Sequence, residues 1–287
     1  MDTMNTFRTW LDESSHVLVA GGAGLSAAAG YDYGDTRRFA ELFPALQRLG
    51  LRARYQLIGL PLPPPLLWGY WSVHVNDIRF GAEPNPLYRR LRALIGDRDH
   101  FVLTSNVDGL FARNGFAEDR VWSPQGDYAR YQCETPCTEE TWASSSIISR
   151  ALAAYDPHSG TVVDETAIPA CPSCGGPVFL NVRKGPEFVE APYYEGGVRF
   201  AHWRRHLADD ARLLVIEVGA GLSTPGVVRW PAENIAYRTP NARLVRINPQ
   251  HPEVPGALGD RALSIAVDIT QVLDRLDGDD EARKANR

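Results

Sequence analysis

Four cysteines in two close pairs carry the most definite chemistry in this 287-residue sequence. Three residues separate Cys133 from Cys137, and two separate Cys171 from Cys174. Thiolates bind zinc tetrahedrally, and spacings this short let one turn present two sulfurs to the same ion. A redox pair or a set of unrelated buried thiols is the alternative. We expect a structural Zn²⁺ ion, because four sulfur ligands leave no open position for chemistry.

A glycine turn is the second candidate for chemistry. Residues Gly22–Ala27 match the pattern G-x-G-x-x-A. Glycines let the backbone approach a pyrophosphate, and a helix N-terminus favours anions. A glycine-rich turn that binds no ligand would look the same. A dehydrogenase would add an acidic residue about 20 positions later, at a strand end. Glu41 lies near that distance in a segment that does not resemble a strand end, so the pattern argues against a dehydrogenase.

A polar segment, Thr104–Asp108, follows the next apolar strand-like run. An amide and a carboxylate at the carboxyl end of a parallel strand are well placed to contact a nucleotide. We therefore take Asn106 and Asp108 as site residues. As alternatives, Asn106 is a turn residue and Asp108 caps the helix that follows.

The elements that position these residues can be predicted from hydrophobic periodicity. An opening helix is indicated near residues 4–11, a second helix begins at residue 25, and residues 138–154 are expected to be helical. The run Pro61–Pro65 is typical of a loop. The predicted strands are His16–Ala20, His100–Leu103, Val178–Val182, Leu213–Val218, Arg243–Ile247 and Leu263–Val267. The pattern predicts an α/β fold, a Rossmann-type parallel sheet domain with a smaller inserted zinc-ribbon or helical module.

Composition excludes several classes of partner. The formal net charge is -5 without a basic stripe, so we do not expect nucleic-acid binding. No run approaches the roughly 20 apolar residues of a membrane span. An apolar segment of signal-peptide length is also absent from the N-terminus, so we expect a cytoplasmic protein.

Taken in this order, the motifs resemble those of the sirtuin family. The family's first motif is similar to Gly22–Gly30, its T-Q-N-I-D motif to Thr104–Asp108, and its late I-N pair to Ile247–Asn248. The resemblance runs from about residue 17 to residue 268. It implies that NAD is bound and consumed as a substrate. The cofactor-binding residues it implies, together with those argued above, are Gly22, Ala23, Gly24, Ser26, Gly30, Tyr33, Arg37, Ser105, Asn106, Asp108, Gln125, Gly219, Ala220, Gly221, Ser223, Asn248 and Asp268.

The resemblance also implies a domain organisation. Residues 1–130 and 183–275 would form the Rossmann-type NAD-binding domain, with a helical insert at about 35–90. Residues 131–182 would form the four-cysteine zinc module. Residues 276–287, which are rich in charge, would be a flexible tail.

Departures from the family are equally informative. Sirtuin deacylases carry a histidine where this chain has Gln125, within Pro124–Tyr128. The segments Gly30–Gly34 and Gly219–Pro225 also differ from the deacylase motifs. The set resembles class M, macrodomain-associated sirtuins. That resemblance implies protein ADP-ribosylation, with an acceptor protein that in some members is a lipoyl-carrier protein, and a candidate macrodomain partner.

Sirtuin deacylation has two steps, cleavage of the nicotinamide–ribose bond and then removal of the acyl group. The replacement of histidine by Gln125 affects the second step. The nicotinamide–ribose bond can still break, but deacylation then needs a base, and an amide cannot accept a proton at neutral pH. A placed base is worth roughly 10²–10⁴ in rate. We therefore predict an ADP-ribosyltransferase with Asn106, Asp108 and Gln125 as catalytic residues. Asp127 is a candidate base for the acceptor, and His74 is either a core or surface histidine or, less favoured, a replacement base. A deacylase that has recruited another base, an NAD hydrolase and a non-catalytic NAD or ADP-ribose sensor remain the alternatives.

Overall fold

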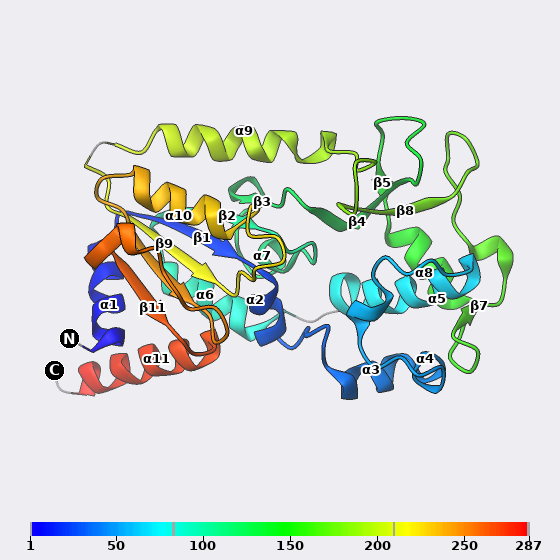
Figure 1. Cartoon of the computed structure of the whole chain (residues 1–287), viewed down its shortest axis with the longest axis horizontal. Coiled ribbons are helices and arrows are strands. Elements are labelled where there is room, and N and C mark those ends of the chain that lie inside the picture. The colour runs from blue at the N-terminus through cyan, green and yellow to red at the C-terminus, as the bar shows by residue number, and fades with distance from the viewer. Residues whose placement is uncertain (1, 82–83, 209, 286–287) are drawn as a thin grey trace.

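The structure, a computed structural model, describes residues 2–81, 84–208 and 210–285. Its largest element is a six-stranded parallel sheet in the order β11-β10-β9-β1-β2-β3 (Figure 1). The strands are β1 (His16–Gly21), β2 (Asp99–Thr104), β3 (Val121–Trp122), β9 (Leu213–Val218), β10 (Arg243–Ile247) and β11 (Ala262–Ile265). This is the strand order of doubly wound dinucleotide-binding folds, which bind ligands where the order reverses. Here that switch point lies between β1 and β9.

Helices cover both faces of this sheet (Figure 1). One face packs on α1 (Thr3–Glu13), α2 (Ala23–Ala28), α6 (Pro86–Ile95), α7 (Leu110–Arg113) and α11 (Ile269–Ala285). The other packs on α9 (Ala191–Arg205) and α10 (Arg229–Arg238). Successive residues of β1 alternate between the two cores: Val17 and Val19 lie in the first, Leu18 and Ala20 in the second. Burial on both faces explains the apolar runs that made these strands predictable.

A second group of elements, here called the small lobe, lies beside the sheet (Figure 1). Its strands are β4 (Gly126–Cys133), β5 (Trp142–Ala143) and β8 (Val178–Val182), which form an antiparallel sheet, and the hairpin of β6 (Tyr155–Asp156) and β7 (Thr161–Val162). Its helices are α3 (Thr36–Leu42), α4 (Pro44–Arg48), α5 (Pro64–Val75) and α8 (Ser145–Ala153). These elements share one apolar core, which also contains Cys133 and Cys171.

Short helical turns complete the chain. Asn76–Phe80 is a single π-helical turn after α5. The 3₁₀ turns are Arg54–Leu57, Glu118–Arg120, Glu165–Ala167 and Gly256–Arg261. In the described part of the chain, no helix is both long and apolar enough to cross a membrane.

The expected α/β class with a parallel sheet is confirmed, and three strands match their predicted bounds: β8, β9 and β10. Other expectations were wrong. Residues 138–144 are not helical, because Trp142 and Ala143 pair with β4 instead. The proline run does not stay a loop throughout, since Pro64 and Pro65 open α5, where a missing N–H costs no hydrogen bond.

Most of the predicted tail is helical, and its flexibility stays a prediction. Helix α11 continues to Ala285, and the side chain of Leu276 is buried in the core against the parallel sheet. The amphipathic pattern is weak here because charged residues dominate the last turns. Residues 286–287 of the predicted tail lie outside the described residues.

Candidate active site

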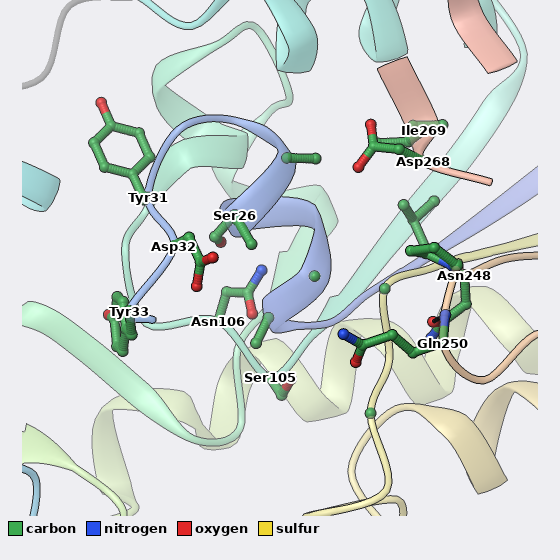
Figure 2. A pocket seen from close by; sticks show the side chains of 18 of the residues that line it. Ser26, Tyr31, Asp32, Tyr33, Ser105, Asn106, Asn248, Gln250, Asp268 and Ile269 are labelled. Carbon is green, nitrogen blue, oxygen red and sulfur yellow. Dashed lines mark hydrogen bonds between the residues drawn. The ribbon is translucent and has the colours of Figure 1, made fainter. Parts of the chain in front are cut away.

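A cavity of about 620 Å³ opens at the carboxyl ends of β1, β2, β9 and β10, at the switch point of the sheet (Figure 2). Eleven of the residues predicted for the cofactor line it: Ala23, Gly24, Ser26, Tyr33, Ser105, Asn106, Asp108, Gly219, Gly221, Asn248 and Asp268. Strand ends bring these residues together from positions more than 200 residues apart in the chain, as Ala23 and Asn248 illustrate.

The glycines of the first motif serve close backbone packing. A Cβ on Gly22 would come within 2.5 Å of the Ala220 Cα, and one on Gly24 within 2.8 Å of the Gly219 Cα. The amide of Gly24 also donates to the Gly219 carbonyl at 2.9 Å. The motif therefore packs the start of α2 closely against the end of β9, at the base of the cavity. Gly22 and Ala220 belong to this contact but do not line the cavity.

Asn106 holds the ends of β1 and β2 together. Its side-chain amide donates to the Gly22 carbonyl at 3.0 Å, and its backbone N–H donates to the Thr104 hydroxyl at 3.0 Å. The residue is 8% exposed, and it lines the cavity between Ser26 and Ser105 (Figure 2). Asn106 is thus more than a turn residue, because its amide is fixed at the centre of the cavity wall.

Asp108 is a buried carboxyl at the same strand end. It accepts a 2.5 Å hydrogen bond from the Ser26 hydroxyl and a 2.9 Å bond from the Leu110 amide at the start of α7. The N-cap of α7 is Gly109, so the alternative that Asp108 caps this helix was wrong, although its carboxyl accepts from the first helical amide. Burial raises the pKa of Asp108 above its ordinary value, against the effect of these two donors. Ser26 itself lies inside α2.

The opposite side of the cavity is built from hydrogen-bonded turns (Figure 2). The Asn248 amide donates to the Ala220 carbonyl at 3.0 Å, and its side-chain oxygen accepts from the backbone of Gln250 and His251. Asp268 caps α11 through the Thr270 amide at 2.8 Å. Hydrogen bonds within the protein thus orient these polar groups, as a preorganised site requires.

Several lining residues were not predicted as site residues. They include Tyr31, Asp32 and Tyr128 on one side and Gln250, His251 and Ile269 on the other. Each lies within three residues of a predicted site residue or motif, so adjacency along a strand-end loop was the available signal.

The four cysteines converge as predicted. Their sulfurs all lie within 4.8 Å of one another, with Cys133 3.7 Å from Cys174 and Cys137 3.6 Å from Cys171. Zinc–sulfur bonds of about 2.3 Å in a tetrahedron place sulfurs roughly 3.8 Å apart. The cluster therefore fits one structural Zn²⁺ ion, held by β4 and by the turn before β8.

Comparisons with known proteins place this architecture. No protein-family model matches the sequence. A Sir2 homologue in complex with ADP-ribose has a TM-score of 0.62 at 20% identity, covering 99% of this chain and 98% of that chain. A Sir2–p53 peptide–NAD⁺ structure has a TM-score of 0.56 at 20% identity, covering 98% of this chain and 100% of that chain. The chain has the sirtuin fold.

Two curated relatives match most of the chain. A "Probable bifunctional ADP-ribose hydrolase/ADP-ribosyltransferase" of Fusarium oxysporum f. sp. cubense is 35% identical over 92% of this chain. The chain spans only 46% of that protein's length. A "Protein ADP-ribosyltransferase" of Staphylococcus aureus is 26% identical over 93% of this chain and 84% of its own length. An "NAD-dependent protein deacylase 2" of Pseudomonas syringae pv. tomato matches less of the chain, 28% identical over 64% of it and 70% of its own length.

Within this sirtuin fold, some predicted residues lie outside the cavity. Gln125 is half-buried and lines a neighbouring cavity with Trp122 and Arg183. Its loop is nonetheless attached to the site, because the Ser123 hydroxyl donates to the Asn106 carbonyl at 2.8 Å. Gln125 is thus absent from the lining of the main cavity, and the residue after it, Gly126, begins β4 at φ +106°.

Arg37, Ser223 and Gly30 are likewise not among the lining residues. Arg37 is 84% exposed on α3 and pairs with Glu41 at 3.4 Å. Glu41 lies within helix α3 and not at the end of a strand. It is therefore not placed as the acidic residue of a dehydrogenase would be. Ser223 is exposed in the loop after β9, and Gly30 turns the chain at φ +95°.

Proposed function

We propose that this chain is an NAD-consuming protein ADP-ribosyltransferase of sirtuin type. It would cleave the nicotinamide–ribose bond of NAD and transfer ADP-ribose to an acceptor protein. The observation that carries the proposal is a sirtuin-type cavity with a fixed amide and a buried carboxyl at one strand end, in a chain with Gln125 at the position of the family's histidine base.

The relatives support the same activity. Both proteins named as ADP-ribosyltransferases align with more than nine tenths of this chain, whereas the deacylases align with at most 64% of it. Since the chain spans about half of the Fusarium protein, the hydrolase part of that protein's name is not transferred to this chain.

Each wall of the cavity has a proposed role. Asn106 would contact the ribose next to the nicotinamide, and Asp108 the nicotinamide carboxamide. Asn248 and Asp268 would hold the adenosine half of NAD, where the turns already orient their side chains. Gln125 faces the neighbouring cavity, which favours a role in orienting the acceptor rather than the ribose.

Other predictions accompany the proposal. The division into residues 1–130 with 183–275, and 131–182, stays a prediction, as does a cytoplasmic location. We also propose a protein acceptor, with a lipoyl-carrier protein as one candidate and a macrodomain as a candidate partner.

Nicotinamide release and transfer of labelled ADP-ribose test the proposal in one assay. Wild-type protein with NAD should release nicotinamide and label an acceptor in a cell lysate. Asn106→Ala should lower both rates by roughly 10²-fold, as for the loss of a single transition-state contact. Asn5→Ala, an exposed asparagine on α1, is the matched control and should keep both rates.

The outcomes separate the alternatives. Nicotinamide release without labelled protein would replace the proposal with an NAD hydrolase. Loss of the acyl group from an acyl-lysine peptide would replace it with a deacylase. NAD binding without nicotinamide release would make the chain a sensor.

A further inference from the structure

Tyrosine and histidine side chains form a continuous hydrogen-bonded chain that begins at the cavity wall. The Tyr33 hydroxyl lies 3.3 Å from the Tyr128 hydroxyl, which in turn lies 3.3 Å from Nε2 of His74. On the other side of the imidazole, Nδ1 lies 3.3 Å from the Tyr70 hydroxyl. Tyr33 and Tyr128 line the cavity, whereas His74 is completely buried. The chain therefore connects the cavity to an imidazole that no solvent reaches directly.

The direction of donation is fixed at the buried end of this chain. The Tyr70 hydroxyl donates to the Arg54 carbonyl at 3.1 Å, and a carbonyl can only accept. Tyr70 must therefore accept from Nδ1 of His74, which places the imidazole proton on Nδ1. Nε2 is then an acceptor for Tyr128, and the Tyr128 oxygen is an acceptor for Tyr33. Every proton in the chain thus points away from the cavity: those of Tyr33 and Tyr128 toward His74, and those of His74 and Tyr70 toward the Arg54 carbonyl.

The surroundings of His74 keep the imidazole neutral. Four aromatic rings surround it at centroid separations of 5.0–5.3 Å: Tyr33, Tyr70, Trp71 and Tyr128. Among the described residues, the charged group acting on it is Arg54, which pairs with Asp77 at 2.5 Å. Burial, helped by the Arg54 charge, holds the pKa of His74 well below its usual range. Burial raises the pKa of Tyr128 to about 12, so its hydroxyl keeps its proton at neutral pH.

We propose that His74 is the terminal proton acceptor for ADP-ribose transfer, reached through Tyr33 and Tyr128, and that it supplies the base that Gln125 lacks. The inference rests on the proposed function. Tyr33 meets the acceptor and is the catalytic residue, whereas Tyr128 and His74 act through it as positioning residues.

The step balances in bonds and protons. As acceptor atom X attacks the ribose carbon, the X–C bond forms and the C–N bond to nicotinamide breaks, with its electron pair passing to the ring nitrogen. The X–H proton goes to the Tyr33 oxygen, the Tyr33 proton to Tyr128, and the Tyr128 proton to Nε2 of His74. Once the product has left, the proton returns to solvent along the same path.

This geometry also restricts the acceptor. Contacts of 3.3 Å are longer than the usual 2.7–2.8 Å of an O–H···O bond, and catalytic hydrogen bonds commonly tighten when the substrate binds. A relay of this kind helps only a nucleophile that must lose a proton, such as a hydroxyl or an amine. A carboxylate acceptor would gain nothing from it.

Two nucleophiles of different protonation provide the test. Solvolysis of NAD in water containing methanol needs proton removal, whereas exchange of labelled nicotinamide into NAD does not, because the pyridine nitrogen carries no proton. His74→Gln and Tyr128→Phe should slow solvolysis at least tenfold, with nicotinamide exchange and the KM for NAD within threefold of wild type. The wild-type loss of solvolysis at acid pH should be absent in His74→Gln.

Controls keep the result interpretable. Tyr155→Phe, a half-buried tyrosine beside the same core, should leave both reactions unchanged. Thermal melting identifies variants that misfold. If His74→Gln misfolds, Tyr33→Phe repeats the test, because Tyr33 is half-buried at the cavity end of the hydrogen-bonded chain. Equal loss of both reactions, or loss of neither, overturns the relay. Absence of both reactions in wild type instead refutes the proposed function.

Discussion

The two lobes of this molecule are stabilised in different ways. The parallel sheet packs between two extensive apolar cores, and the residues of β9 are at most 1% exposed. In the small lobe, strands as short as two residues surround a core of aromatic rings, and two of the cysteines form part of that core. A metal held by four cysteines can contribute folding free energy outright, whereas the parallel sheet has no such site among the described residues. From this comparison we expect the parallel sheet to be stable without a metal and the small lobe, which contributes Tyr128, to depend on a zinc ion.

Removal of the metal should have the largest effect, and it should destabilise the small lobe more than the parallel sheet. Structural zinc contributes an apparent 10–16 kcal/mol, roughly, where binding is coupled to folding. Cys171→Ser, or exhaustive chelation, should therefore cost on the order of 5 kcal/mol or more and unfold the small lobe first. The measurement is hydrogen exchange of β4 and β8 against β1 and β9, with metal content determined in parallel.

Ser173→Ala is the matched control, because this exposed residue lies between two of the cysteines and leaves all four sulfurs in place. It should retain zinc and normal exchange. Equal protection of both lobes in the Cys171→Ser protein would show that the small lobe does not need the metal.

A buried ion pair between β9 and β10 tests what stabilises the parallel sheet. Arg246 on β10 binds Glu217 on β9 at 2.5 Å, and neither side chain has any exposed surface. Without Glu217, the buried Arg246 keeps the partly exposed Glu233 at 2.7 Å as a carboxylate partner, so the cost should be at most the roughly 3–5 kcal/mol of breaking a buried pair. Glu217→Gln should lower the free energy of unfolding by up to that amount, measured by urea denaturation with zinc present. The double variant Glu217→Leu, Arg246→Leu should recover at least half of the loss.

An exposed pair provides the comparison for that experiment. Arg90 and Asp277 lie 2.7 Å apart with side chains 32% and 64% exposed. Surface pairs contribute about 0–1 kcal/mol, so Asp277→Asn should change stability little. If Glu217→Gln cost no more than Asp277→Asn, the buried pair would be irrelevant to the stability of the large lobe.

Predictability from sequence followed the same division between lobes. The strands β9 and β10 are continuous apolar runs buried on both faces, and the sequence alone predicted their bounds. In the small lobe, β5 is only two residues long and depends on pairing with β4, so no local pattern distinguishes it from the helix that follows. The start of α5 was missed because its prolines are compatible with both a loop and a first helical turn.

The candidate site was predictable where chemistry coincided with a strand end. Asn106 was found because polar residues follow an apolar strand there, whereas Asn248 was found because Ile247–Asn248 resembles the family's I-N pair. Gln125 was also placed by family resemblance, and it lines the neighbouring cavity, which sequence spacing cannot reveal. The contact between Tyr128 and His74 spans 54 residues and arises only when α5 packs against β4.

The smallest expected effect concerns Asp108, which lies where the two lobes meet. Because burial raises its folded pKa above the unfolded value of about 3.9, the neutral carboxyl favours folding, and that stability is lost as pH rises through the folded pKa. Asp108→Asn should therefore be more stable than wild type at pH 8, with a smaller difference at about pH 3.5, below the unfolded pKa, while nicotinamide release falls. Asp156→Asn should show the opposite sign, because backbone donors lower the pKa of that exposed carboxyl. A stability difference for Asp108→Asn that is identical at both pH values would mean that this carboxylate is ionised at no cost to folding, and the cavity would then hold a fixed negative charge opposite the developing ribose cation.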